Sequence, residues 1–143
     1  MNIWPPLLFA GVRIKSISAD FSEAVIQLRD RKLNMNYVGV HFGGAMFSMT
    51  DPFHMVLAMN RLGRGYVVWD KSAEIEYLKP GKGTLTAHFK VTDDMIADVR
   101  ANTPNDGVAD WEVAGPVSAT CRIRVTRLEP VNGLTLVGES AAD

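Results

Sequence analysis

One aspartate in an apolar stretch is the first group in this sequence that could do chemistry. Asp51 lies within residues 44–62, a segment rich in methionine, alanine and leucine. Its apolar neighbours are Met46, Phe47, Met49, Phe53 and Met55. A carboxylate in such surroundings is either paired or has a raised pKa, because burial disfavours its charged form. A group of this kind is suited to act as a general base.

Three glycines precede this apolar segment: Gly39, Gly43 and Gly44. Glycine permits a positive φ and a close approach of the backbone. The first N–H groups of a helix have no partner inside the helix, so they can hold a carbonyl oxygen or an anion. A carboxylate near oriented amides is an arrangement that favours hydrolysis.

Asp51 also has a purely structural interpretation. Asp-Pro is typical of an N-cap followed by proline at the first helical position, and Asp51 would then only cap a helix. If the helix instead begins near Gly44, Pro52 must kink it, because the carbonyl of Ser48 loses its donor. The sequence leaves both interpretations open.

The remaining pattern predicts an α+β protein. Alternation predicts strands at 24–28, 66–78, 83–91, 108–114 and 117–125, and apolar spacing predicts helices at 44–62 and 93–101. The turn at 79–82 predicts a hairpin between the second and third of these strands. Val67, Trp69, Ala73 and Ile75 share one parity, which we expect to be buried. One buried helix against a largely antiparallel sheet follows from this order.

The motif Asn36-x-x-Gly39-x-x-x-Gly43-Gly44-x6-Asp51 resembles the signature of hotdog-fold acyl-CoA thioesterases of the phenylacetate-pathway and 4-hydroxybenzoyl type. Residues 75–81, Ile-Glu-Tyr-Leu-Lys-Pro-Gly, are similar to the strand of that family that ends in a Tyr-x-x-Pro turn. The closest resemblance is to the uncharacterised branch in which phenylalanine precedes the glycine pair. The order of elements agrees over roughly residues 10–128.

The resemblance implies a hotdog fold, a curved antiparallel sheet wrapped around one long central helix. The length and the lack of a linker predict a single domain over 1–143, the resemblance places its core at about 10–128, and the small and polar residues 138–143 predict a frayed C-terminal tail. It also implies a homo-oligomer, either a dimer or a tetramer, with sites for an acyl-CoA or acyl-carrier-protein substrate between protomers. No cofactor is expected beyond the CoA moiety of the substrate.

The resemblance also assigns roles to residues. Asp51 corresponds to the carboxylate that activates water or attacks the thioester carbonyl, the Gly43 N–H to the oxyanion donor, and Asn36 to the side chain that positions them. The sequence departs from the family at Phe42, which replaces a histidine, while His41 stands one residue earlier. We assign Gly44, Phe42, His41 and Lys71 to substrate binding.

Several side chains keep two interpretations. Lys71 has the parity of the expected buried face, but a strand bulge would exchange its position with that of Asp70. His54 could pair with Asp51 on one helical face, or simply pack in the core. The methionines of the helix could line an acyl pocket or fill the core. Arg122, Arg124, Arg127, Lys79 and Lys82 could meet a CoA phosphate or lie in solvent.

The composition of the sequence bears on which partners, disulfides and metal sites can be expected. The chain has 143 residues and a net charge of −1, which gives no reason to expect a nucleic-acid or membrane partner. One cysteine, Cys121, excludes an intrachain disulfide, and the three histidines form no zinc-binding array. With no export signal, the cytoplasm is expected. The alternatives to a thioesterase are a non-catalytic acyl-binding or assembly protein and a hydratase.

Overall fold

The computed structural model describes residues 2–103, 108–114 and 119–127, with side chains described up to residue 103. The first half of the chain contains α1 (Pro5–Ala10), β1 (Val12–Ile17), β2 (Glu23–Leu28), the 3-10 helix η1 (Lys32–Asn34), α2 (Gly43–Thr50) and α3 (Phe53–Leu62). The second half contains β3 (Tyr66–Ile75), β4 (Leu85–Lys90), α4 (Asp93–Asn102), β5 (Val108–Ala114) and β6 (Ala119–Arg127).

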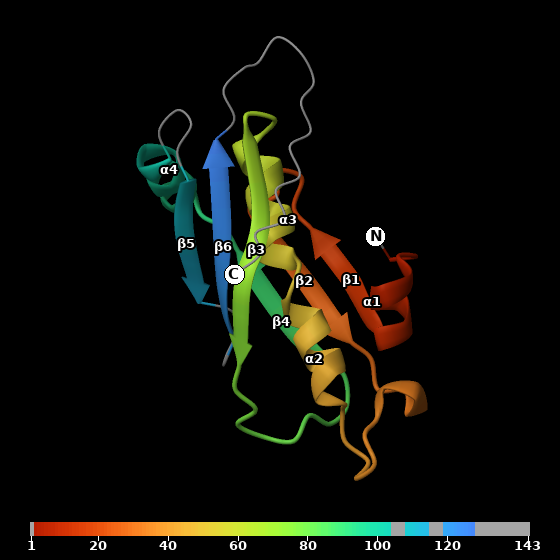
Figure 1. The fold of residues 1–143 in the computed structure, drawn as a ribbon. Coiled ribbons are helices and arrows are strands. Elements are labelled where there is room, and N and C mark those ends of the chain that lie inside the picture. Colours follow the sequence, from red (N-terminus) through yellow and green to blue (C-terminus); the bar gives the residue numbers. More distant parts are fainter. Residues whose placement is uncertain (1, 104–107, 115–118, 128–143) are drawn as a thin grey trace.

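The strands form two antiparallel groups on either side of a helical column. One group has the order β1-β2-β4 and the other β3-β6-β5. The helices α2 and α3 follow one another between these groups, and the strands bend around them (Figure 1). The predicted α+β architecture, an antiparallel sheet around a central helix, is therefore confirmed.

The central helix is interrupted at Asp51 and Pro52. Residues 44–62 were predicted to be helical, with a kink at Pro52 if the helix began near Gly44, and the structure divides this segment into α2 and α3. Proline has no N–H, so the Ser48 carbonyl cannot receive the usual helical bond at this point. The helix resumes when the Val56 N–H bonds the Pro52 carbonyl at 3.0 Å. It ends as predicted at Gly63, which has a φ of 83°.

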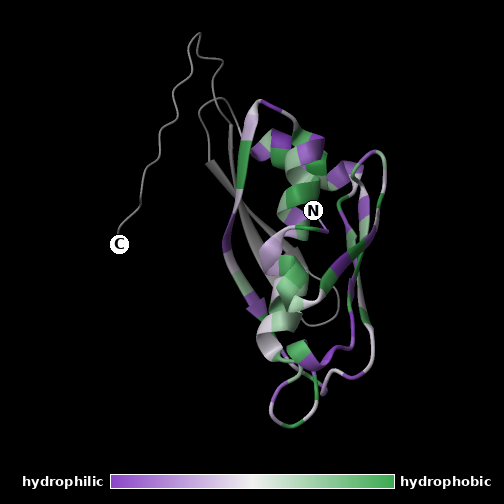
Figure 2. Cartoon of the chain, turned by 90° about the vertical axis from the view of Figure 1, so that its right-hand side faces the viewer, coloured by the Kyte–Doolittle hydropathy of each residue, from purple (hydrophilic) through white to green (hydrophobic). Residues whose placement is uncertain are grey.

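The core lies between α2–α3 and the strands. Ala87 and Phe89 are buried on one face of β4, as is Val91 just after its end, as the alternation predicts, and His88 is exposed on the other face. Phe89 contacts Phe53 of α3, with ring centroids 5.3 Å apart. Apolar residues, green in Figure 2, recur along both central helices. Ile96 and Val99 of α4 are also buried, as their spacing predicts.

The predicted hairpin between residues 66–78 and 83–91 is wrong. β3 pairs with β6, whereas β4 pairs with β2, so the two segments belong to different groups of strands. The structure has bends at Lys79 and Gly83 instead of a tight turn at 79–82, and residues 76–84 carry the chain from one group to the other past the start of α2. This crossing places the 77–83 loop beside the glycine-rich segment, where it matters for the candidate site.

A short N-terminal helix was not predicted. Residues 5–10 begin with two prolines, which fit the first turn of a helix. The helix ends at Gly11, which has a φ of 82°. Before it, the Asn2 side chain binds both backbone groups of Ile14 in β1, at 2.8 and 3.1 Å. The N-terminal segment thus occupies part of the outer edge of β1.

None of the helices in the described part of the chain is long and apolar enough to cross a membrane.

Candidate functional site

The first turn of α2 presents backbone amides without helical partners. The helix begins at Gly43 after Phe42, whose side chain provides no cap. The Ala45 and Met46 N–H groups bond the Phe42 carbonyl at 3.0 and 3.2 Å. Those of Gly43 and Gly44 make no hydrogen bond among the described residues. Together with the positive end of the helix dipole, these two amides can receive a carbonyl oxygen that gains negative charge.

Aromatic rings lie against both of these glycines. The Tyr77 hydroxyl donates to the Gly43 carbonyl at 2.9 Å. A Cβ atom on Gly43 would lie 3.2 Å from that hydroxyl oxygen, and one on Gly44 would lie 2.4 Å from Cε1 of Phe42. Neither glycine has a positive φ. A side chain at either position would therefore crowd a neighbouring ring, whereas the expected positive φ occurs at Gly39.

Asn36 organises the loop that precedes α2. Its Oδ1 accepts hydrogen bonds from the N–H groups of Val38 and Val40, both at 3.1 Å. Its backbone N–H bonds the Val40 carbonyl at 2.7 Å, and Gly39 takes a φ of 78° at the turn. The Oδ1 atom is thus committed to the loop, and only Nδ2 remains for the positioning role that the resemblance implies.

His41 connects the glycine-rich segment to the 77–83 loop. Its side chain is buried, with 1% exposed, and its Nε2 lies 2.6 Å from the Gly83 carbonyl oxygen. Because a carbonyl only accepts, Nε2 carries the proton and Nδ1 is left as an acceptor. Nδ1 has no partner among the described residues. The His41 N–H also bonds the Gly81 carbonyl at 3.0 Å, so this residue fixes the loop against the start of α2.

Asp51 lies at the other end of α2. Its N–H bonds the Phe47 carbonyl at 3.0 Å, which makes it the C-cap of α2. The next helix, α3, has Pro52 as its N-cap and no side-chain capping bond, so Asp51 does not cap α3. The carboxylate is half-buried, and this burial raises the pKa of Asp51. It makes no hydrogen bond among the described residues, and is therefore available to a ligand.

Comparison with protein families finds one match, to a domain of unknown function, DUF4442, over residues 1–126. The chain belongs to the DUF4442 family. Curated proteins gave no match.

Several solved structures share the fold of this DUF4442 chain. The "Probable Thioesterase" of unknown function from Pseudomonas aeruginosa is 14% identical with a TM-score of 0.71, and the alignment covers 82% of this chain and 83% of that one. The PaaI protein of the phenylacetic acid degradation operon of E. coli is 21% identical, with a TM-score of 0.55 and coverages of 90% and 87%. A hypothetical thioesterase from Streptococcus pneumoniae, solved with coenzyme A, is 21% identical, with a TM-score of 0.54 and coverages of 83% and 88%. These likenesses confirm the hotdog fold.

The structure separates two of the predicted catalytic groups of the DUF4442 chain. Gly43 and Asp51 lie eight residues apart on α2, which corresponds to about 12 Å along a helix axis. A single carbonyl group cannot contact both within one protomer. The start of α2 instead gathers Gly43 and Gly44 with Phe42, His41 and the loop ordered by Asn36.

Lys71 does not lie on a buried face. The pairing of β3 with β6 shifts between Asp70 and Ser72, so Lys71 occupies a bulge. Val68 is buried, whereas Val67 and Trp69 are 38% and 39% exposed. The predicted alternation is therefore wrong in the first half of the strand and correct after the bulge, where Ala73 is half-buried. Asp70 is half-buried and Lys71 exposed, which is the exchange that a one-residue bulge causes.

His54 is a core residue. It is buried, and its ring meets Phe89 edge-on with centroids 5.0 Å apart. Burial lowers the pKa of His54 to about 4, and no hydrogen bond or ion pair joins it to Asp51 within residues 2–103. Of the helix methionines, Met49 is buried, Met46 and Met55 pack against the core, and Met59 is exposed.

Two features of the site were outside the sequence prediction. Tyr77 was noted only as part of a turn motif, although its hydroxyl bonds the first residue of α2. The signal was the aromatic residue three positions before Pro80, but nothing in the sequence placed that loop beside α2. No group of three or more metal-ligating side chains comes together in the described part of the chain. Arg122, Arg124 and Arg127 lie where only the backbone is described.

Proposed function

We propose that this protein hydrolyses an acyl thioester, with an acyl-CoA or an acyl carrier protein as substrate. Support comes from the half-buried Asp51 carboxylate and from the open amides at the start of α2. The fold is shared with proteins that are named thioesterases, one of them solved with coenzyme A. The single observation that carries the proposal is that Asp51 is not used to cap α3.

The proposed reaction uses the ionised carboxylate as a base. Asp51 takes a proton from water while the water oxygen bonds to the thioester carbonyl carbon. The oxyanion is held by the N–H of Gly43, with Gly44 beside it. When the intermediate collapses, the carbon–sulfur bond breaks and the thiolate leaves with the proton. Direct attack by Asp51 on the carbonyl carbon is the covalent variant of the same step.

The separation along α2 implies that two chains build each site. A distance of about 12 Å between Gly43 and Asp51 is too long for one reacting carbonyl. We infer that the carboxylate of one protomer works with the helix start of its partner in a homo-oligomer. Phe42, His41 and Lys71 are then candidates for contacts with substrate, and the Asn36 Nδ2 group is a candidate for water positioning.

The central experiment is hydrolysis of a broad acyl-CoA panel by the wild type and Asp51→Asn. We expect kcat to fall by about a hundredfold or more with the fold retained, because the base is lost. Asp94→Asn is the matched control, since Asp94 is exposed in α4, and it should keep the wild-type rate. Because burial raises the Asp51 pKa above 3.8, kcat/KM should decline on the acid side at a higher pH than an exposed aspartate gives. An Asp51→Asn enzyme with undiminished kcat ends the catalytic assignment.

Mixing two inactive variants tests whether the site is shared. Gly43→Pro removes the N–H at the first helical position, where proline is tolerated and the extended Phe42 before it is compatible. An equal mixture of Gly43→Pro and Asp51→Asn, refolded together, should recover about a quarter of the wild-type rate if protomers pair at random. No recovery, with mixed oligomers demonstrated by mass spectrometry, contradicts the shared site.

A non-catalytic acyl-binding protein is the second candidate. It is favoured by Phe42, whose ring lies over Gly44 where the resembled family carries a histidine. The same panel separates the two functions, because an acyl-binding protein would bind acyl-CoA with no turnover, and Asp51→Asn would leave that binding unchanged.

A further inference from the structure

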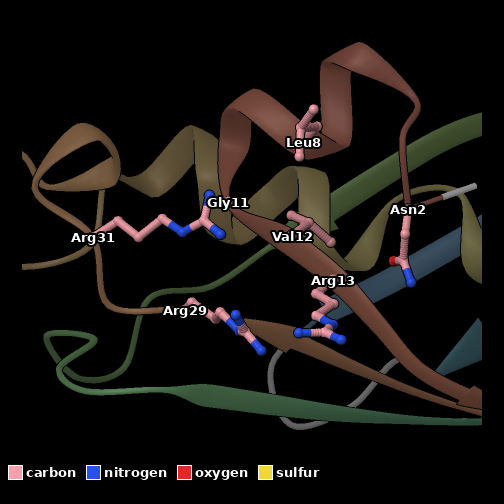
Figure 3. Close-up of a pocket in the computed structure, with 7 residues that line it drawn as sticks. All are labelled: Asn2, Leu8, Gly11, Val12, Arg13, Arg29 and Arg31. Carbon is pink, nitrogen blue, oxygen red and sulfur yellow. The ribbon is translucent and has the colours of Figure 1, made fainter.

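A cleft of about 230 Å³ opens beside the N-terminal helix, outside the groups discussed above. It lies between the end of α1, the first residues of β1 and the segment after β2. Its lining consists of Asn2, Leu8, Gly11, Val12, Arg13, Arg29 and Arg31. Three of these seven residues are arginines, and none is acidic. Figure 3 shows the Arg31 guanidinium group close to Gly11, Arg13 on β1 and Arg29 just after the end of β2.

Among residues 2–103, no side chain neutralises these three guanidinium groups. None of them makes a side-chain hydrogen bond or ion pair with any residue in 2–103. Arg61 and Arg100 behave differently. Arg61 binds Asp93 and the Val91 carbonyl, and Arg100 binds the Arg61 carbonyl. No residue in 2–103 thus occupies the side-chain donors of the cleft arginines, and these donors can serve a ligand.

The floor of the cleft is built in a fixed conformation. Gly11 has a φ of 82°, and a Cβ there would lie 2.4 Å from Nδ2 of Asn34. The Gly11 carbonyl accepts the Arg29 N–H at 3.2 Å, which fixes the backbone of that arginine. The Arg31 N–H in turn bonds Oδ1 of the buried Asn34 at 3.2 Å. Two of the three arginines are thus held at their backbones by buried contacts.

The three arginines and the apolar wall of the cleft together indicate a chemical class of ligand. Guanidinium groups bind phosphate oxygens through paired hydrogen bonds, and several together favour more than one phosphate. Leu8 and Val12 add an apolar wall, so a bare inorganic ion would leave part of the cleft unused. We propose that this arginine cleft binds a ligand with two or more phosphate groups next to a less polar part, as in a nucleotide.

The location also indicates a possible source of those phosphates. Asn34 separates the cleft from the start of α2, since its Nδ2 donates to the Arg29 carbonyl at 2.7 Å and its carbonyl accepts the Phe42 N–H at 2.8 Å. If the proposed thioesterase function holds, the nucleotide end of an acyl-CoA could occupy the cleft while its thioester lies at α2. A free nucleotide is the other source of the same chemistry.

The first arm of the test measures binding without turnover. Adenosine 3′,5′-bisphosphate is titrated calorimetrically into the wild type, Arg29→Ala, Arg31→Ala and the double variant. We expect about tenfold weaker binding for each single change and a larger loss for the double, and weaker wild-type binding in high salt. Arg64→Ala is the control, because Arg64 is an exposed cation that does not line the cleft. Equal affinities in wild type and cleft variants, or equal losses in Arg64→Ala, overturn the proposal.

The second arm identifies the source. For an acyl-CoA substrate, KM should rise in the cleft variants while kcat is kept, and the matching acyl-pantetheine, which lacks the nucleotide, should show no change. If bisphosphate binding is lost but KM for acyl-CoA is unchanged, the cleft serves a separate phosphorylated ligand. A protein that hydrolyses no thioester but binds the bisphosphate through these arginines would refute the proposed function and leave the cleft assignment intact.

Discussion

The start of α2 and the arginine cleft lie on two sides of one buried residue, Asn34, and their hydrogen-bond donors differ in charge. At the start of α2 the donors are neutral amides of two glycines that the rings of Tyr77 and Phe42 lie against, and burial disfavours the charge on Asp51 at the other end of this helix. At the cleft the donors are permanently charged guanidinium groups at the surface. The carboxylate of Asp51 can take up and release a proton, whereas the guanidinium groups of the cleft can only balance charge that a ligand brings. The two proposals therefore assign chemistry and anchoring to separate regions.

Glycine also serves different purposes in the two regions. Gly11 in the cleft has a left-handed conformation, with φ at 82°. Gly43 at α2 has an ordinary helical conformation and is small because the Tyr77 ring lies against it. Glycine therefore provides a left-handed backbone conformation in the cleft and room for a neighbouring ring at α2.

Replacing each of these glycines by alanine should separate the two regions most strongly. Gly11→Ala forces a strained φ and drives a Cβ into Asn34, whose buried hydrogen bonds would be lost, so we expect a loss of about 2–4 kcal/mol in the free energy of unfolding. Gly43→Ala gains helix propensity and only crowds the Tyr77 hydroxyl at 3.2 Å, so a change below about 1 kcal/mol is expected.

Urea unfolding followed by circular dichroism measures both changes. Gly39→Ala is a useful third variant, because Gly39 has a φ of 78° but open space around its Cβ position. It should cost about 1 kcal/mol, the strain alone. A Gly11→Ala protein as stable as Gly39→Ala would show that the contact with Asn34 is unimportant.

The sequence predicted features that depend on neighbouring residues better than contacts between distant segments. Features that depend on neighbours along the chain were correct, including the helix end at Gly63, the Pro52 interruption and the buried face of β4. Strand pairing was not, because β3 meets β6, about fifty residues away, and no local pattern encodes that choice. The Lys71 bulge reversed the faces of β3 for the same reason.

The candidate site shows the same difference between local features and contacts of distant segments. Asp51 and the glycine pair stand out locally, as a charge among apolar residues and as a break before a helix. The arginine cleft was missed because Arg13 lies on β1 and Arg29 just after the end of β2, and the pairing of β1 with β2 brings them together, with Arg13 opposite Gln27. Tyr77 likewise reaches Gly43 only after the chain crosses between the two groups of strands. Each missed feature is a contact between segments distant in sequence.

The pH dependence of the free energy of unfolding tests the buried side chain of His54 in α3. Burial lowers the His54 pKa from 6.5 to about 4, so between these values the unfolded chain binds a proton that the folded chain does not. The free energy of unfolding therefore has its full value above pH 6.5, where His54 is neutral in both states, and it decreases as the pH falls towards 4. The loss amounts to at most about 3 kcal/mol.

His54→Leu removes this titration and keeps an apolar contact with Phe89. Urea unfolding of both proteins at pH 7.5, 5.5 and 4.5 isolates the His54 contribution, because the other groups cancel in the difference. We expect the stability gap between wild type and variant to shift in favour of the variant as the pH falls. A gap that stays constant from pH 7.5 to 4.5 would mean that His54 is protonated as readily in the folded chain as in the unfolded one.

The smallest expected effect belongs to the single hydrogen bond between the 77–83 loop and α2. Tyr77→Phe removes the donor to the Gly43 carbonyl but keeps the ring over the glycine. Because Tyr77 is half-exposed, water replaces the lost partner, and the free energy of unfolding should fall by about 1 kcal/mol or less. Tyr37→Phe is the control, since Tyr37 is fully exposed. If the loop also aligns the Gly43 N–H, Tyr77→Phe lowers kcat several-fold while bisphosphate binding at the cleft is unchanged. Equal losses of both would instead mean that the two regions behave as one site, joined through Asn34.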